Sequence, residues 1–576
     1  MELTGDSFIY LDLNEHSMRD KTTAQPMNVS AVNRRTLLKG VGAGAAMGLA
    51  GCMSGGESQG TNDGGGDSGG EESTQTPAGE LNRGGHLRLS AIASADTLNG
   101  WQLDSKHERL IIQSLNSYLT WMKPDLTVGP DLATDWEANE DATQWTFYLR
   151  EDATWHHNGD RVVAEDIAAT ANAIYAEDST AAGKGSLGPL ESAEVVDDTT
   201  VRFNLSASDG LIPRRWARTV APIYPADVIE NRRDEMATTD FGSGPFELES
   251  FSAGDETVLT PYDDYYLTDE DGNQLPYLDK VTITQLPDTN TQVTSFRNED
   301  VDILWNASRS QWDRIKSASG VNSKRIDASG FTVIQMRSDK PPFDDNRVRT
   351  AFKLAVNRSA LLNGAASGLG TVAYDNPIGP AYPGHSDVPE RTQDLDEAAR
   401  LLEEAGYGES GDPIELDFYA PSSPSKVLDT TVIAAEHFNQ LPNVTINVQQ
   451  QSYDNWISNT WLNAQFYTSW YTQRPTTDTL LLQVWHSEGS WNEAHWSDEE
   501  FDQAADAARS AQTEEERNEH LATCQQILHE RGPSVISFYI DALTAQQEYV
   551  NGFDPYPTQK WVRSQQVSLG DDAPTQ

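Results

Sequence analysis

Aromatic side chains are concentrated in one stretch of the chain, between residues 456 and 496. Tryptophan and tyrosine rings offer flat apolar faces that stack on sugars and other organic groups, together with a polar edge that can donate a hydrogen bond. Pockets for small organic solutes are commonly lined by such rings. The alternative is that most of them fill a hydrophobic core. The rings of this segment are Trp456, Trp461, Phe466, Tyr467, Trp470, Tyr471, Trp485, Trp491 and Trp496.

Signatures of catalysis are missing from the body of the sequence. Outside the glycine- and serine-rich stretch 54–77 it contains no G-x-S-x-G elbow, and nowhere does it contain H-E-x-x-H or a phosphate-binding G-x-x-x-x-G-K-S/T. We therefore expect no enzyme activity, no catalytic residue, no metal site and no cofactor. The 89 acidic residues make an accidental carboxylate pair conceivable. A secreted, lipid-anchored hydrolase thus remains an alternative.

The charge balance is strongly acidic, with 89 Asp and Glu against 41 Lys and Arg and a formal net charge of -48. Such a surface repels nucleic acid and anionic lipid. The acids are scattered over all segments of the chain, and their mutual repulsion is screened by concentrated salt. The composition therefore predicts a halophilic source and excludes nucleic acid as a partner.

The first part of the chain has the pattern of an export signal. Arg34 and Arg35 form a twin-arginine pair, followed by the short, mildly apolar stretch 40–50, which is too short to span a membrane. The next residues, Leu-Ala-Gly-Cys, resemble a lipobox, in which Cys52 receives a lipid. Residues 54–77 are rich in Gly, Ser, Thr, Asp and Glu and predict a flexible tether. The sequence therefore predicts an exported protein anchored by lipid to the outer face of the plasma membrane, with translation starting at Met1 or, as the acidic first residues favour, at Met27.

Beyond the tether, short apolar strands alternate with amphipathic helices, as in α/β domains. Residues 87–91 alternate as a strand. Asp345 and Asp394 are expected to cap helices, the second of which stops at Gly406. A third helix is expected to begin at Ser497, with Glu500 at capping-box spacing. A chain of 576 residues is long enough for two or three such lobes.

Several motifs along residues 84–560 resemble the family 5 extracellular solute-binding proteins, the oligopeptide- and dipeptide-binding type, in a haloarchaeal-like lipoprotein. The block at 342–358 resembles the family's P-F-x-D-x-R-V-R-x-A followed by A-x-D-R, and 401–407 resembles L-L-x-E-A-G-Y. Further matches are the Trp and Leu-Arg run at 132–150, the W-H-H-N-G-D at 155–160, and the G-S-G-P-F turn at 242–246.

The resemblance implies an α/β fold of two lobes, of the periplasmic-binding-protein type II-like class, with an inserted subdomain in the first lobe. The crossings between lobes are expected near 331–336 and 535–539. The implied division is 1–51 extension and signal, 52–83 tether, 84–331 first lobe with the insertion at about 127–234, 332–525 second lobe, and 526–576 return to the first lobe and tail.

The implied function is capture of peptides or similar polar organic solutes for an ABC importer. The lobes would close on the solute and deliver it to a membrane permease driven by ATPase subunits, with the binding protein itself a monomer. In peptide-binding members, a G-W-x-x-D segment supplies an aspartate for the peptide's amino terminus. Gln473 stands in that place here, and Asp478 lies five residues further on. Sugar, glycoside or nickel binding therefore remain open within the same family.

The rings expected to line the cleft follow from where the family binds solute. Trp470, Tyr471 and Trp485 are the predicted stacking rings, with Trp305 from the first lobe as a fourth. Gln473 and Asp478 complete the predicted ligand-binding set.

Overall fold

The structure is a computed structural model that describes residues 82–574, apart from 94, 104, 105, 473, 475, 559 and 560. Its main feature is a large mixed sheet in the order β15-β14-β16-β12-β17-β11-β1-β10-β9-β8, with β13 paired to β17. The parallel pairs are β14 with β15 and β16, and β1 with β10 and β11; the rest are antiparallel. Its strands are β1 His86–Ala91, β8 Phe246–Ser252, β9 Glu256–Pro261, β10 Lys280–Gln285, β11 Ile303–Leu304, β12 Val321–Met336, β13 Gly370–Val372, β14 Ile414–Pro421, β15 Val444–Gln451, β16 Phe466–Thr472 and β17 Ser534–Gln547.

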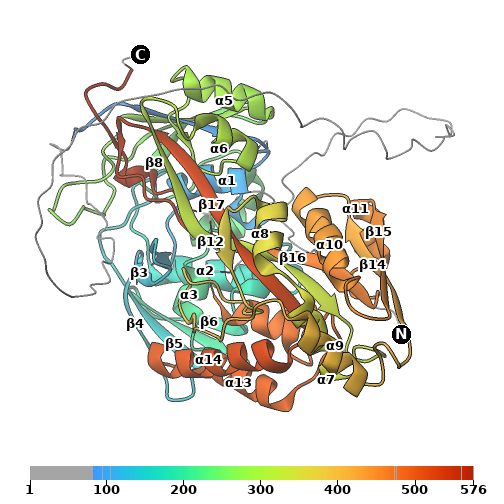
Figure 1. Cartoon of the computed structure of the whole chain (residues 1–576). Coiled ribbons are helices and arrows are strands. Elements are labelled where there is room, and N and C mark those ends of the chain that lie inside the picture. Colours follow the sequence, from blue (N-terminus) through green and yellow to red (C-terminus); the bar gives the residue numbers. More distant parts are fainter. Residues whose placement is uncertain are drawn as a thin grey trace, which may run out of the picture. The chain divides into compact units, whose positions relative to one another are not determined.

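Two long antiparallel strands, β12 and β17, run through the centre of this sheet (Figure 1). Both segments expected to cross between lobes lie in them, residues 331–336 at the end of β12 and 535–539 at the start of β17. We call residues 82–320 and 548–574 the first lobe and residues 337–531 the second lobe. The mixed α/β, two-lobed fold predicted from the sequence is confirmed. The predicted boundary at 525 lies within helix α14, which ends at Arg531.

A separate antiparallel sheet belongs to the first lobe, in the order β4-β5-β7-β6. Alternate residues of β5 are buried, among them Trp145 and Phe147, because successive side chains of a strand point to opposite faces. Helix α2 packs on β6 and β7, so one face of the sheet is covered. The strands are β4 Ala133–Ala138, β5 Gln144–Leu149, β6 Leu190–Asp197 and β7 Thr200–Leu205; two-stranded ribbons are β2 Thr120–Met122 with β3 Val128–Pro130, and β18 Val550–Asn551 with β19 Ser568–Leu569.

The helices complete both lobes. In the first lobe they are α1 Lys106–Leu115, α2 Ala164–Tyr175, α3 Ile212–Trp216, α4 Ala226–Asn231, α5 Thr289–Arg297 and α6 Arg309–Ile315. In the second they are α7 Asn346–Ala355, α8 Arg358–Ala366, α9 Leu395–Glu404, α10 Ser425–Phe438, α11 Tyr453–Asn459, α12 Asp478–Leu480, α13 Glu499–Ser510 and α14 Glu514–Arg531. Short 3-10 or π turns are η1 Gly100–Gln102, η2 Lys184–Ser186, η3 Arg233–Ala237, η4 Leu481–Trp485 and η5 Ser564–Gln566.

Two of the three predicted helix starts are confirmed and one is wrong by one residue. The Asp345 and Asp394 carboxylates accept the backbone N–H groups of Arg347 and Glu397, which caps α7 and α9. The third helix is capped by Asp498, which accepts the N–H of Phe501, and not by Ser497. A carboxylate one residue later satisfies the free N–H groups of the first turn as well as a serine hydroxyl does.

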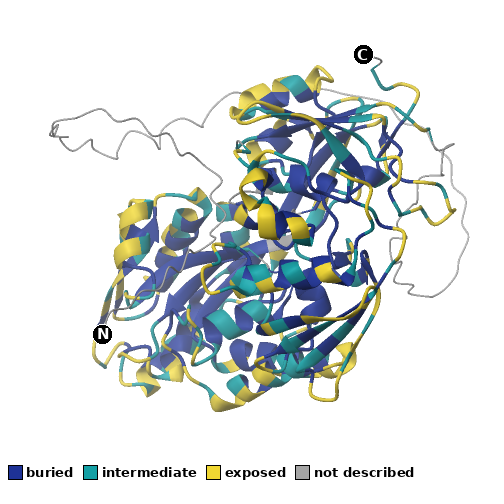
Figure 2. Cartoon of the chain, turned by 180° about the vertical axis from the view of Figure 1, so that it is seen from behind, coloured by how far each residue is buried: buried dark blue, intermediate teal, exposed yellow. Residues whose placement is uncertain are grey.

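Each lobe has its own hydrophobic core, which Figure 2 shows as dark blue sheet interiors beneath helices with exposed outer faces. In the second lobe the rings of Phe418 and Phe466 stack at 4.1 Å, with Phe352 and Phe438 packed around them. The first lobe packs β1, β10 and β11 around Leu87. Among the described residues, no helix is both long enough and apolar enough to cross a bilayer.

Candidate functional site

Side chains from both lobes share one buried cluster, which we call the interlobe cluster. The first lobe contributes Tyr118, Trp121, Met122, Leu126 and Ala217, together with Tyr556 and Trp561 near the carboxyl end. The second lobe contributes Tyr382, Tyr471, Trp485 and Trp496, with Phe331 of β12. The lobes therefore meet over an aromatic surface that lies beside the two crossing strands.

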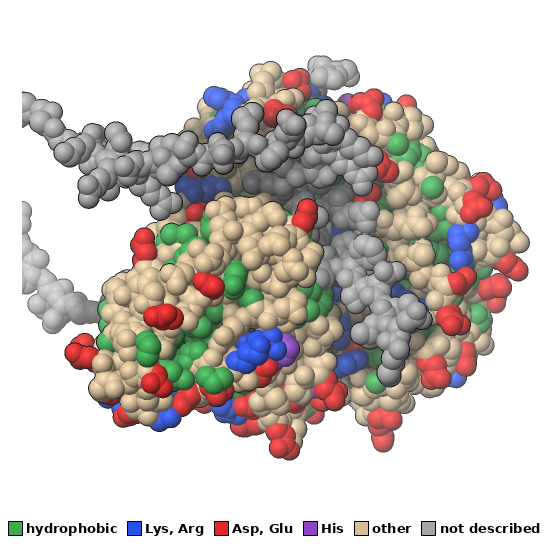
Figure 3. Space-filling view, turned by 90° about the vertical axis from the view of Figure 1, so that its right-hand side faces the viewer, with side chains coloured by type: hydrophobic (Ala, Val, Ile, Leu, Met, Phe, Trp, Pro, Cys, Tyr) green, Lys and Arg blue, Asp and Glu red, His purple; other side chains and the backbone are tan. Residues whose placement is uncertain are grey.

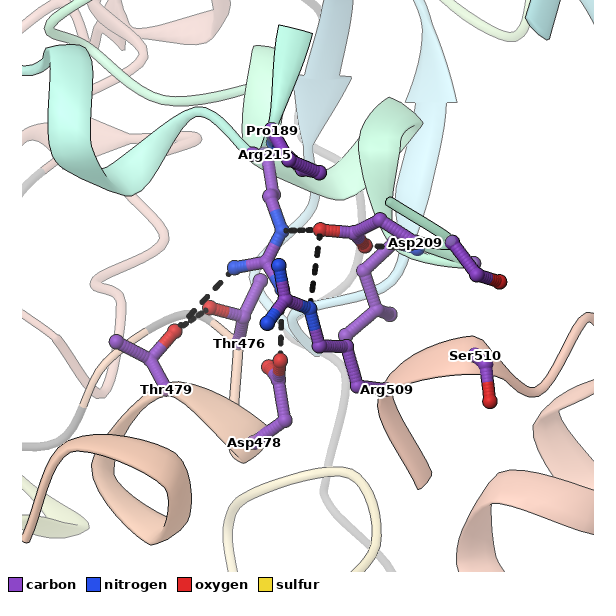
Figure 4. Close-up of polar contacts among 12 residues, drawn as sticks. Pro189, Asp209, Arg215, Thr476, Asp478, Thr479, Arg509 and Ser510 are labelled. Atoms are coloured by element: carbon purple, nitrogen blue, oxygen red, sulfur yellow. Dashed lines mark hydrogen bonds and ion pairs between the residues drawn. The ribbon is translucent and has the colours of Figure 1, made fainter. Parts of the chain in front are cut away.

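An arginine bridges the two lobes next to this cluster (Figure 4). Arg215, on α3 of the first lobe, donates from Nε to Oδ2 of Asp209 at 2.7 Å. Its Nη2 donates to Oδ2 of Asp478, on α12 of the second lobe, also at 2.7 Å. Arg509 of α13 approaches the same Asp209 oxygen at 3.9 Å. One guanidinium thus joins two carboxylates from opposite lobes.

The bridge is buried, and its electrostatics follow from that. Asp209 and Asp478 are 0% and 1% exposed. Burial alone would lower the pKa of Arg215, but Asp478 and Asp209 together outweigh burial and raise it. The guanidinium is therefore charged throughout the physiological range, and separating the lobes would strip Asp478 of its cation.

Backbone groups of the two lobes also bond to each other close by. The N–H of Gly210 donates to the carbonyl of Arg509 at 2.9 Å, and Nη2 of Arg517 donates to the carbonyl of Gly210 at 3.2 Å. A Cβ on Gly210 would lie 2.0 Å from the carbonyl oxygen of Ala511. Only glycine allows this approach. Gln512 Nε2 adds a bond at 3.0 Å to the carbonyl of Asn139.

The structure places two of the four predicted rings in the interlobe cluster. Tyr471, on β16, is 4% exposed and lies 6.1 Å from the parallel ring of Trp491. Trp485 is 1% exposed, and its Nε1 donates to Oγ of Ser534 at 2.9 Å. Both rings are enclosed where the lobes meet.

The other two predicted rings lie elsewhere. Trp470 immediately precedes Tyr471 on β16, so its side chain leaves from the opposite face of the strand, where its ring lies 5.5 Å from that of Trp456. Trp305 packs in the core of the first lobe with the strands around Leu89. The structure therefore does not bring the four rings together around one point.

A buried carboxylate lies directly under Tyr471. Glu493 is 0% exposed and accepts hydrogen bonds from Trp461 Nε1 at 2.9 Å, from Ser469 Oγ at 2.9 Å and from the hydroxyl of Tyr471. Burial raises the pKa of Glu493, and these hydrogen bonds oppose the rise only in part. The network fixes the orientation of the Tyr471 ring.

The remaining predicted residues divide into one that is located and four that are not. Asp478 takes part in the interlobe bridge, where it accepts a hydrogen bond from Arg215. Gln473, Cys52, Arg34 and Arg35 lie outside the described residues.

Sequence reasoning missed the arginines of the first lobe that face the second. Arg214, Arg215 and Arg218 occur within five residues of a chain that has 41 basic and 89 acidic residues. That local density was the available signal. The predicted ligand contacts were based on aromatic rings and not on basic residues.

The surface of the protein differs from this arginine-rich junction. On the face that Figure 3 presents, acidic side chains are spread singly and do not form one patch. Within the part of the chain that the structure describes, no three His, Cys, Asp or Glu side chains are grouped as a metal site requires. The positive charge buried between the lobes is therefore a local exception in an acidic molecule.

The comparisons with known proteins agree with this architecture. The family profile described as bacterial extracellular solute-binding proteins, family 5 Middle, matches residues 127–492. The dipeptide-binding protein of Escherichia coli (strain K12) is 22% identical over 457 residues, which covers 74% of this chain and 83% of the relative. The periplasmic oligopeptide-binding protein OppA of Salmonella typhimurium is 24% identical over 527 residues, 81% of this chain and 93% of the relative.

Solved structures show the same fold. The structure of HbpA2 from Haemophilus parasuis superposes with a TM-score of 0.75 at 20% identity and covers 84% of this chain and 100% of that one. The family profile matches more than half of the sequence. The chain belongs to family 5 of the extracellular solute-binding proteins.

Proposed function

We propose that this protein captures a polar organic solute between its two lobes and delivers it, chemically unaltered, to the permease of an ABC importer. The observation that carries the proposal is the junction between the lobes. Of the strands that the structure describes, only β12 and β17 run through both lobes, whereas the interlobe cluster and the Arg215 bridge are side-chain contacts. Such contacts can open while the strands stay paired, which is the arrangement that hinge closure needs.

The names of the relatives indicate which solute classes to test first. Two relatives are named for dipeptides and oligopeptides, so peptides are the first class to test. The aspartate that peptide-binding members offer to an amino terminus is replaced by Gln473, and Asp478 is engaged by Arg215. Sugars, glycosides and nickel complexes are the solute classes to test next. For any of these solutes, we expect Tyr471 and Trp485 to be the rings closest to it.

The anchoring proposal rests on the sequence. Cys52 carries lipid, Arg34 and Arg35 direct export by the twin-arginine route, and residues 52–83 hold the body near the outer face of the membrane. The lobes divide in β12, after about residue 331, and again where α14 ends at Arg531, with the insertion at about 127–234. The net charge of -48 suits a halophilic source. The binding protein acts as a monomer with permease and ATPase subunits as partners.

A binding protein and a lipid-anchored hydrolase are separated by what happens to the solute. The test is a thermal-shift screen of purified protein in roughly 2 M KCl, against peptides, neutral sugars, sugar acids and nickel complexes. A solute that binds only the folded state raises the melting temperature by mass action. Each solute is then recovered and its mass measured. We expect a raised melting temperature and an unchanged mass. Conversion of a bound solute into product would contradict the proposal, and so would the absence of binding across the whole panel.

A further inference from the structure

Arg218, at the junction of the lobes, is a cation whose guanidinium has no partner among the described residues. It lies two residues after α3 and is partly buried. Its Nη1 has no contact with solvent and no hydrogen-bond acceptor, and among the described residues its guanidinium makes no ion pair. A buried ionised group normally has an opposite charge or several hydrogen bonds, because leaving it bare in a low-dielectric interior is costly. The described part of the chain therefore leaves the Arg218 cation without the anion that would offset its burial.

The charges around Arg218 are mostly of its own sign. Burial comes first among the causes that lower its pKa to about 9, followed by repulsion from Arg474, Arg109 and Arg215, against which the attraction of Asp478 is small. Asp478 is already bonded to Arg215. The environment thus disfavours a second cation and favours an incoming anion.

Two buried hydroxyls near the same arginines also lack partners. Tyr118 is 0% exposed and Tyr382 is 2% exposed, and the hydroxyl oxygen of each makes no hydrogen bond. Both belong to the interlobe cluster, Tyr118 from the first lobe and Tyr382 from the second. Tyr118 feels the charge of Arg109 as well as the stronger opposite charge of Asp131, and Tyr382 feels the charge of Arg474. Buried hydroxyls without partners are unusual in proteins, and a tyrosine O–H is a suitable donor to a carboxylate.

We infer that the captured solute is an organic anion and that its carboxylate lies between the lobes against Arg218, in the field of Arg109 and Arg474, with Tyr118 and Tyr382 as further donors. This inference rests on the proposed function, since it names the solute class for the same junction. A planar guanidinium matches the two oxygens of a carboxylate, and the charge-assisted bond gains strength in a site closed to water. A solute presenting an ammonium group to this point would be repelled.

The experiment uses probes that differ only in charge. The matched pairs are trialanine and trialanine amide, succinate and succinamide, and glucuronate and glucose. Each is titrated calorimetrically into the full protein and into Arg218→Met, with Arg400→Gln as a control on the exposed face of α9, where Arg400 pairs with Glu397 and Glu404. We expect the acid of at least one pair to bind at least tenfold more tightly than its neutral partner. Arg218→Met should remove that difference, while Arg400→Gln should leave it within twofold.

A second readout separates lost recognition from lost folding. Because the guanidinium of Arg218 has no partner within residues 82–574 as the structure describes them, Arg218→Met should melt no lower than the unsubstituted protein in the absence of solute, while it loses the rise in melting temperature that the acid produces. Tight binding of neutral solutes only, or an acid whose affinity Arg218→Met leaves within twofold, would overturn this inference and leave the proposed function standing. Failure of every probe to bind the unsubstituted protein would overturn both.

Discussion

Two buried clusters of arginine and aspartate are built in opposite ways. Inside the second lobe, one carboxylate serves two cations: Asp375 accepts from Nη2 of Arg358 at 2.8 Å and from Arg391, and its Oδ1 accepts the N–H of Ile536 at 3.0 Å. Between the lobes, one cation serves two carboxylates, with Arg215 joining Asp209 and Asp478. The first cluster joins segments of the second lobe to the crossing strand β17, and the second cluster joins one lobe to the other.

The two clusters also differ in how completely they are satisfied. Both oxygens of Asp375 are bonded, and although burial alone would raise its pKa, Arg358 and Arg391 hold it well below its usual range. Beside the interlobe bridge, Oδ1 of Asp478 and Nη1 of Arg218 have no partners. A lobe interior can be optimised for stability alone. At a junction that opens for a solute, polar groups without a partner in the protein can form hydrogen bonds with the solute.

The largest effect is expected inside the lobe. Asp375→Ala leaves two buried guanidinium groups without their carboxylate, and we expect a loss of about 3–5 kcal/mol in the free energy of unfolding. Urea unfolding followed by tryptophan fluorescence measures it. A loss below about 1 kcal/mol would mean that this cluster does not hold the second lobe together.

Removing the interlobe carboxylate should act on closure and spare the stability of each lobe. Asp478→Ala takes away one of the two partners of Arg215, so the contact between the lobes weakens. For the solute that the screen identifies, we expect affinity to fall about tenfold, or ~1.4 kcal/mol. Titration calorimetry measures the change. Unaltered affinity together with a large loss of unfolding free energy would assign the bridge to the same structural class as Asp375.

Glu493 offers a smaller, pH-dependent effect under the predicted ring Tyr471. Because burial raises the pKa of Glu493 above the ordinary 4.5, the folded protein takes up this proton at a higher pH than the unfolded chain does. Its contribution to stability therefore increases as the pH falls through the raised pKa toward 4.5, and it is lost as the pH rises. Glu493→Gln should flatten the slope of unfolding free energy against pH in that window. The exposed Glu488→Gln should keep the original slope; identical slopes for all three proteins would refute the assignment.

The smallest effect is expected at a surface pair. Asp313 contacts Lys316 at 2.6 Å, but both side chains are 40% exposed. Asp313→Ala should change the free energy of unfolding by less than about 0.5 kcal/mol, and by less still in molar salt because of screening. A loss as large as that of Asp375→Ala would show that burial is not what distinguishes the clusters.

Much of the fold could be predicted from the sequence because local signals carried it. Asp345 and Asp394 cap helices wherever the chain goes next, since the cap bonds reach only two or three residues. The strand segments 331–336 and 535–539 were apolar at strand length, and both lie in the central strands. The family motifs then specified how the lobes are arranged.

The site was harder to predict because its members come from distant parts of the chain. Arg215 and Asp478 are 263 residues apart, and no periodicity links them. Ring type did not separate Trp470, which packs on Trp456, from Tyr471, which faces the other lobe. One residue of register on a strand decides which face a side chain takes. Nothing in the sequence near 214–218 indicates that these arginines are enclosed, because their burial depends on the packing of the two lobes.

The central claim is that the lobes move apart and close over a solute, and one distance tests it directly. Glu140 and Glu515 are exposed on opposite sides of the junction, near the bond between Gln512 and Asn139. Spin labels at Glu140→Cys and Glu515→Cys, with Cys52→Ser, report their separation by pulsed electron resonance. Without solute, we predict a distribution of label distances that is broad or centred at a long distance. When the solute is added, the distribution should become narrow and centred at a shorter distance. The same distribution with and without bound solute, and in Asp478→Ala, would contradict the account.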